Sequence, residues 1–140
     1  MTSAATIYRV IVPAAPDADL SPNARVHWRT RAKAVSAARM MSCWAARESL
    51  CGFSFGPDPV DVRLRVLWPK GRKQMDRTNL AYMVKAHIDG LTDSGAWFDD
   101  KEVQIVNVEQ VLWGKQDSAT RAQYPGGCTV FDLERREAAE

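Results

Sequence analysis

The sequence predicts a single α+β domain over residues 1–140, with a mixed or largely antiparallel sheet packed with two main helices. Three observations lead to this prediction. Four short segments are β-branched or alternate between apolar and polar residues, two longer segments have helical character, and their order is β-α-β-α-β-β. A length of 140 residues suits one domain, and the chain contains no internal repeat.

Four strands are expected, at residues 6–13, 60–68, 103–113 and 128–133. The second segment, VDVRLRVLW, largely alternates apolar and polar residues, which is typical of a half-buried strand. In the third segment the alternation changes phase near Ile105 and Val106, which indicates a bulge. Loops are expected between the elements, at residues 14–24, 52–59, 92–95 and 114–127, with a charged tail at 134–140.

The longest helix is expected at residues 25–50, where alanine is abundant and Gly and Pro are absent. Its apolar contacts are expected from Val26, Trp28, Val35, Met40, Met41 and Trp44. A second helix is expected to begin near Thr78 and to end near Gly90. Helical spacing places Tyr82, Lys85 and Asp89 on one face of this second helix.

Composition excludes several classes of protein. No apolar stretch approaches the ~18 residues that suggest a membrane-spanning helix. The first residues, MTSAATIYRV, lack the basic start and apolar run of a secretory signal. The three cysteines have no CxxC spacing, which argues against a disulfide framework or a zinc site. A soluble, cytoplasmic protein is therefore expected.

Charge is divided unevenly along the chain. Residues 1–88 carry 14 Lys and Arg against 6 Asp and Glu, a balance of +8, whereas residues 89–140 carry 5 against 11, a balance of −6. The expected first helix carries six cations and no acid before Glu48: Arg25, Arg29, Arg31, Lys33, Arg39 and Arg47. This pattern favours binding of a polyanion such as DNA, although a solvated helix face has the same composition.

The segment DRTNLAYMVKAHIDGLTDSGAWFDD, residues 76–100, begins and ends on aspartate. One interpretation is structural, because aspartate caps helices and an Asp-Asp pair is ordinary in turns. The other is a divalent metal site, because carboxylate oxygens are the ligands that Mg²⁺ prefers. Lys85 could then stabilise charge on a phosphate. Three cations directly before Asp76 could guide a DNA backbone: Lys70, Arg72 and Lys73.

The order and spacing of this segment closely resemble those of RusA-like Holliday junction resolvases, especially phage and prophage members. The motif that carries the resemblance is Asp76-x-x-Asn79-Leu80, then Lys85, then Asp89-Gly90-Leu91, then Gly95, then Asp99-Asp100. The opening strand, the proline-containing turn and LSPNARVHWRTRAKAV, residues 20–35, are also similar to that family. The resemblance covers about residues 6–113.

The resemblance implies a Mg²⁺-dependent endonuclease, with Mn²⁺ as a substitute, that acts as a homodimer on four-way or other branched DNA in recombination and repair. Its catalytic residues would be Asp76, Lys85 and Asp100, with metal ligands Asp76, Asp89, Asp99 and Asp100. The residues expected to contact DNA are Arg25, Arg29, Arg31, Lys33, Lys70, Arg72 and Lys73.

Two departures from the family pattern bear on activity. Thr78 stands where the family usually has its second aspartate, and the lysine lies nearer to the asparagine in some members. One alternative is therefore a weakened or inactive protein of the same fold that binds junctions. A second alternative is an acidic-helix interaction domain with no role on nucleic acid.

The two histidines and the five tryptophans are expected mainly in the core or on the basic surface. His87 is expected to be a packed core residue, and His27 a surface or phosphate-contacting residue. Most of the five tryptophans are expected in the core. Trp28 flanks the arginines and Trp97 precedes the Asp pair, so these two are candidates for stacking on unpaired bases, although core packing is also expected of tryptophan.

Overall fold

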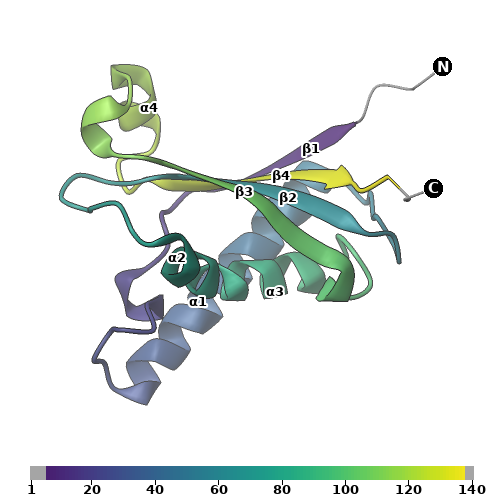
Figure 1. The fold of residues 1–140 in the computed structure, drawn as a ribbon, viewed down its shortest axis with the longest axis horizontal. Coiled ribbons are helices and arrows are strands. Elements are labelled where there is room, and N and C mark those ends of the chain that lie inside the picture. Colours follow the sequence, from purple (N-terminus) through teal and green to yellow (C-terminus); the bar gives the residue numbers. More distant parts are fainter. Residues whose placement is uncertain (1–5, 138–140) are drawn as a thin grey trace.

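One mixed sheet with helices on one face forms the body of the molecule (Figure 1). The structure, a computed structural model, describes residues 6–137. Its strands are β1 (Ile7–Val12), β2 (Val60–Leu67), β3 (Val103–Val111) and β4 (Cys128–Arg135). Its α-helices are α1 (Trp28–Leu50), α2 (Arg77–Met83), α3 (Lys85–Asp93) and α4 (Ser118–Gln123). The single α+β domain with a mixed sheet and two main helical segments is confirmed.

The sheet order is β1-β4-β2-β3. β4 is antiparallel to both β1 and β2, whereas β2 and β3 are parallel and are joined through α2 and α3. In the parallel pair, Val62 lies opposite Ile105 and Arg63 lies opposite Asn107, so Val106 is left without a partner. The predicted bulge is therefore confirmed at Val106.

Alternate residues of β2 point toward the helices and are buried. The core includes Val60, Val62, Leu64 and Val66 from this strand and Phe131 and Leu133 from β4. Helices α1, α2 and α3 lie on this side of the sheet, and α4 lies beyond one end of it (Figure 1). None of the helices within residues 6–137 is long and apolar enough to cross a membrane.

The buried face of α1 differs from the prediction. Small residues dominate it: Ala34, Ala38, Ser42, Ala46 and then Leu50. Four of the residues expected to pack are exposed instead: Trp28, Val35, Met40 and Trp44. Small residues are required on this face because α3 approaches closely, since a Cβ added to Gly90 would lie 2.2 Å from the carbonyl oxygen of Arg39. Large side chains do not fit between helices at that separation.

Several features of the helices also differ from the prediction, and β4 extends to Arg135, into the segment predicted as a charged tail. The first helix begins at Trp28 rather than at residue 25, and the Nδ1 atom of His27 accepts a hydrogen bond from the backbone N–H of Arg29 at 3.1 Å. The second predicted helix is interrupted at Val84, which separates α2 from α3. The loop predicted at residues 114–127 contains α4, a helix of only six residues.

Candidate functional site

The segment that joins β2 to β3 places the candidate residues. Asp76 directly precedes α2, and its Oδ1 atom accepts hydrogen bonds from the backbone N–H groups of Thr78, at 2.9 Å, and Asn79, at 3.2 Å. A carboxylate in this position satisfies two N–H groups and interacts favourably with the helix dipole. Asp76 is therefore an N-cap, as the structural interpretation predicts. Within residues 6–137, its Oδ2 atom makes no hydrogen bond or ion pair.

Gln110 of β3 fixes the chain just before Asp76. Its Oε1 atom accepts hydrogen bonds from Trp68 Nε1 and from the backbone N–H of Met75, both at 2.9 Å. Its Nε2 atom donates to the carbonyl oxygen of Met75 at 2.8 Å. This pairing ties α2 to the sheet. Sequence reasoning missed Gln110, because a single glutamine in a strand belongs to no motif.

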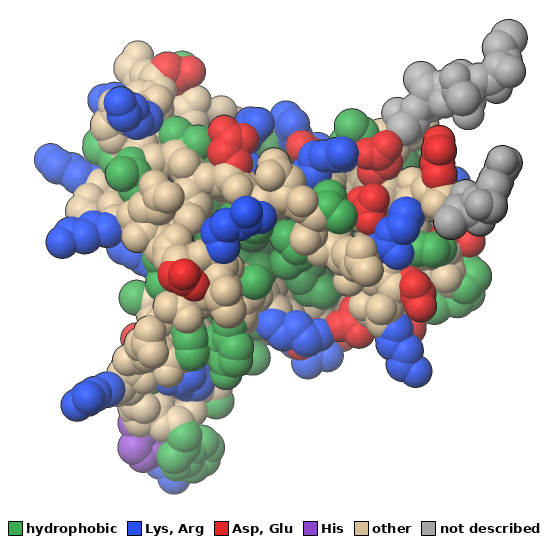
Figure 2. Space-filling view, in the orientation of Figure 1, with side chains coloured by type: hydrophobic (Ala, Val, Ile, Leu, Met, Phe, Trp, Pro, Cys, Tyr) green, Lys and Arg blue, Asp and Glu red, His purple; other side chains and the backbone are tan. Residues whose placement is uncertain are grey.

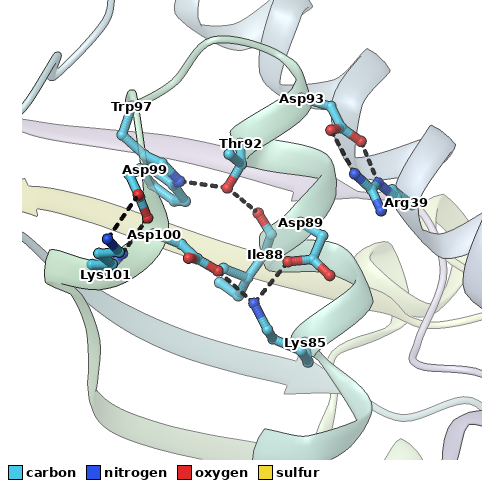
Figure 3. Close-up of polar contacts among 10 residues, drawn as sticks. All are labelled: Arg39, Lys85, Ile88, Asp89, Thr92, Asp93, Trp97, Asp99, Asp100 and Lys101. Carbon is cyan, nitrogen blue, oxygen red and sulfur yellow. Dashed lines mark hydrogen bonds and ion pairs between the residues drawn. The ribbon is translucent and has the colours of Figure 1, made fainter.

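Lys85 and two aspartates form a cluster on the exposed side of α3 (Figure 3). Lys85 Nζ donates to Asp89 Oδ1 at 2.7 Å, across one helical turn, and also to the carboxylate of Asp100. The hydrogen bonds to Asp100 and then to Asp89 raise the pKa of Lys85 above its ordinary value. The bond from Lys85 lowers the pKa of Asp100. At neutral pH the cluster therefore holds one positive and two negative charges.

The turn between α3 and β3 carries Asp100 back to Lys85. The buried Trp97 donates from Nε1 to Thr92 Oγ1 at 2.7 Å. The backbone N–H of Phe98 donates to the carbonyl oxygen of Gly56 at 2.9 Å. The first contact ties the turn to α3, and the second ties it to the loop before β2. Trp97 is thus a core residue and not a stacking surface, whereas the neighbouring Phe98, which sequence reasoning missed, is exposed.

Asp99 does not join the cluster. Its Oδ1 atom accepts a hydrogen bond from the backbone N–H of Lys101 at 3.0 Å, and its Oδ2 atom lies 3.9 Å from Lys101 Nζ. Figure 3 shows the Asp99 side chain turned toward Lys101 rather than toward Lys85. Across residues 6–137, no three Asp, Glu, His or Cys side chains come together as a metal-binding group. Of the four predicted ligands, the structure unites only Asp89 and Asp100.

The pair nevertheless fits Mg²⁺ by donor type. Asp89 and Asp100 both contact one ammonium group, so their oxygens already surround a cation. Mg²⁺ is usually held by one or two carboxylates, several waters and substrate phosphates, so two aspartates suffice. For a metal to bind between Asp89 and Asp100, Lys85 Nζ would have to break its contact with at least one of these two carboxylates.

A shallow groove of about 200 Å³ lies beside the cluster. Tyr82, Lys85 and Asp89 line one side of it, which confirms that they share a face. Arg31 and Val35 of α1 line the other side. The groove therefore joins the helix rich in arginine to the helix that carries Lys85.

The predicted DNA-contacting cations fall into two groups. Arg25, Arg29, Lys33, Lys70 and Lys73 are exposed, and none of them forms an ion pair within residues 6–137. The other two are partly withdrawn, since Arg31 donates to the carbonyl oxygen of Ala24 at 2.7 Å and the Arg72 guanidinium lies 4.5 Å from the ring centroid of Trp68. In the view of Figure 2, Lys and Arg side chains (blue) project at the left end of the molecule, whereas most Asp and Glu side chains (red) lie toward the right.

Comparisons with known proteins identify a moderate homologue but no family. No protein-family profile matches the chain. An uncharacterized protein from Xylella fastidiosa (strain Temecula1) is 40% identical over 82 residues, which cover 56% of this chain and 52% of that protein. The chain thus spans about half the length of the relative that it matches. This similarity shows a moderate homologue and assigns no family.

Proposed function

We propose that the protein is a RusA-like, Mg²⁺-dependent endonuclease that cuts four-way or other branched DNA. The observation that carries the proposal is the cluster in which Asp89 and Asp100 share the ammonium group of Lys85. The segment between β2 and β3 brings these residues together from positions that match the family motif. The exposed, unpaired cations of α1 and of residues 70–73 supply a surface for the DNA backbone.

The carboxylates of Asp89 and Asp100 would hold the metal, and Asp76, which lies outside the cluster, would contribute only after a rearrangement. Bound Mg²⁺ supplies the charge that polarises the scissile phosphate and activates the attacking water. Asp100 is suited to this role because its carboxylate already holds a cation, the ammonium group of Lys85. Asp99, which faces Lys101, would assist only after its side chain turned.

Lys85 would act as a positive charge rather than as a base. Its raised pKa keeps Nζ protonated at neutral pH, so it cannot accept a proton from water. Its side chain is 59% exposed, so its Nζ atom can reach a phosphate once it leaves one carboxylate. In that position it would stabilise the charge that develops on the phosphate oxygens.

The homodimer is inferred from the symmetry of the proposed substrate and not from a feature of the chain. A four-way junction has two-fold symmetry, so two copies related by a two-fold axis would present one cluster to each of two opposed strands. The dimer is therefore part of the proposal. Sedimentation of the free protein and of its junction complex would measure it.

The alternative, a junction-binding protein with weak or no cleavage, is favoured by one observation. Thr78, which stands where the family has an aspartate, is exposed, and its N–H donates to Asp76. With no third carboxylate at the cluster in residues 6–137, metal affinity would depend on two aspartates. A Thr78→Asp variant should tighten Mg²⁺ binding if Asp76 belongs to the site.

The test is metal-dependent nicking of a labelled four-way junction by the parent protein, Asp100→Asn and Asp93→Asn. Asp93 is the matched control, because its carboxylate pairs with Arg39, at 2.9 Å, and not with Lys85. We expect Mg²⁺-dependent cleavage that Asp100→Asn lowers about 10²-fold or more, whereas Asp93→Asn cuts at close to the parent rate. Binding without cleavage by the parent would support the alternative, and no binding at moderate salt would support an interaction domain.

A further inference from the structure

The groove beside Lys85 continues along α1 toward its N-terminal end. A second hollow on α1 is lined by Trp28, Arg31, Ala32, Val35, Ser36 and Arg39. It shares Arg31 and Val35 with the groove that Tyr82 and Lys85 line. The two hollows therefore adjoin at Arg31 and Val35, with Trp28 lining one of them and Lys85 and Asp89 lining the other. We call this path of two adjoining hollows the α1 groove.

Trp28 stands at the projecting end of the α1 groove. Helix α1 begins away from the sheet, at the lower tip of the molecule (Figure 1), and the Trp28 side chain there is 68% exposed. Its ring centroid lies 5.6 Å from that of His27 and 5.3 Å from the guanidinium carbon of Arg29. A large apolar ring in water, bordered by the guanidinium group of Arg29, is suited to a flat ligand that carries negative charge.

Tyr82 provides a second aromatic surface at the other end of the groove. It is 57% exposed and lines the hollow together with Lys85 and Asp89. Between the two aromatic residues, the floor is apolar at Ala32 and Val35. Arg31 lies on both hollows, so a positive group is present along the path.

We propose that the α1 groove binds an unpaired stretch of a DNA strand, with bases stacked on Trp28 and Tyr82. This inference rests on the proposed function and names the part of the branched substrate that the protein recognises. Bases have flat faces that stack on aromatic rings without regard to sequence, and they are accessible only where the duplex is open. The unpaired cations Arg25, Arg29 and Lys33, near the Trp28 end, complement the phosphates of such a strand.

Trp44 offers a matched control on the same helix. It is 66% exposed, almost as much as Trp28, but it lines a different hollow with Ile11, Pro13 and Glu48. That hollow lies next to the edge strand β1 and does not reach Lys85. If exposed tryptophans served only general adhesion, the two would contribute equally.

The experiment measures binding of fluorescent oligothymidine in buffer with EDTA, at one fixed salt concentration, so that no cleavage takes place. The proteins are the parent, Trp28→Ala, Trp28→Phe, Tyr82→Ala and Trp44→Ala, each checked for folding by circular dichroism. We expect affinity to fall about 10-fold for Trp28→Ala, with a smaller loss for Tyr82→Ala. Trp28→Phe should retain most of the affinity, because it keeps an aromatic face, and Trp44→Ala should bind as the parent does.

Two results would overturn the inference. Equal losses for Trp28→Ala and Trp44→Ala, or no loss for either, would show that Trp28 does not stack on bases. A parent protein that does not bind oligothymidine would point instead to a protein partner on the apolar floor. Junction cleavage separates the two proposals, since a parent that cuts junctions while Trp28→Ala binds normally refutes only the stacking. Trp28-dependent binding without any cleavage refutes only the endonuclease.

Discussion

Arginines on the open face of the sheet have acidic side chains as partners, whereas arginines at the start of α1 have none within residues 6–137. On the sheet, Arg9 pairs with Asp132 at 2.7 Å, and Arg63 pairs with Glu134 at 2.7 Å. Arg65 lies 3.2 Å from the carboxylate of Glu109. These pairs join neighbouring strands on the face that α1, α2 and α3 leave uncovered (Figure 1).

The start of α1 has cations without acids. Arg25, Arg29 and Lys33 form no ion pair within residues 6–137. Paired charges on a sheet neutralise one another and contribute modestly to cross-strand stability. Unpaired charges of one sign leave a field that attracts a polyanion. The difference indicates that composition alone does not identify a binding surface, because both regions are rich in arginine.

Lys85 is a third case, since two acids pair with one cation. The excess acid leaves the cluster negative where the DNA backbone would approach. A divalent cation would reverse that sign and make the cluster compatible with a phosphate.

Replacing Lys85 with Met should lower the single-turnover rate of junction cleavage by about 10²- to 10³-fold, because a charge contact to the transition state is lost. Junction binding should change little. Lys101→Met is the control, since Lys101 is an exposed lysine near the same cluster but contacts only Asp99. If Lys85→Met cuts at the parent rate, Lys85 is only a surface partner of Asp89 and Asp100.

The attachment of α1 to α3 should weaken in acid. Ser42 Oγ and His87 Nδ1 lie 2.7 Å apart, and burial lowers the pKa of His87 from 6.5 to about 4. The unfolded chain therefore binds a proton that the folded protein excludes, so stability falls as pH decreases from 6.5 to 4, by about 3 kcal/mol in all. Chemical denaturation at several pH values would measure this.

Matched histidine variants sharpen the pH test. A His87→Gln variant should lose this slope, whereas a His27→Asn variant should keep it, because Asn can still cap α1. A parent whose stability is flat between pH 6.5 and 4 would show that His87 is not held neutral by burial.

Removing the unpaired cations at and just before the start of α1 should weaken junction binding by about 10-fold or more. The triple variant Arg25→Ala, Arg29→Ala, Lys33→Ala should also make the negative slope of log K against log salt shallower by about 2 to 3, since each phosphate contact contributes about −0.9. The control removes the same number of charges from the sheet: Arg9→Gln, Arg63→Gln, Arg65→Gln. If the two triple variants lose the same amount of junction affinity, the distinction between paired and unpaired cations is wrong.

The smallest effect is expected on the sheet itself. Arg65→Gln should lower the free energy of unfolding by less than about 1 kcal/mol, because both partners of this pair are about half exposed and are screened by solvent. Added salt should reduce even this difference. A loss much larger than this, measured by urea denaturation, would mean that the sheet pairs hold the fold together.

Local patterns in the sequence predict most of the sheet. The four strands lie close to their expected positions, and the change of phase at Ile105 and Val106 marks the observed bulge. These features depend on which residues alternate, and alternation can be read along the chain. The short helix α4 could not be found, because six residues carry too little periodicity.

Contacts between distant segments could not be predicted. The small residues on the buried face of α1 follow from its close packing on α3 at Gly90, which brings together residues far apart in sequence. The candidate site, too, could be predicted only where its contacts are local in sequence. Helical spacing predicts that Lys85 meets Asp89, but the partnership with Asp100 depends on the turn that Trp97 and Phe98 hold in place.

The most direct test of the account is a crystal structure of the protein soaked in Mn²⁺, with anomalous diffraction to locate the metal. The account predicts a Mn²⁺ ion bound by Asp100 together with Asp89 or Asp76, and Lys85 Nζ displaced from at least one of its two carboxylates. An Asp100→Asn crystal should lack this ion. No ion at Asp100 in saturating Mn²⁺, with Lys85 still contacting both aspartates, would contradict the account, because the cluster would then be a structural ion pair.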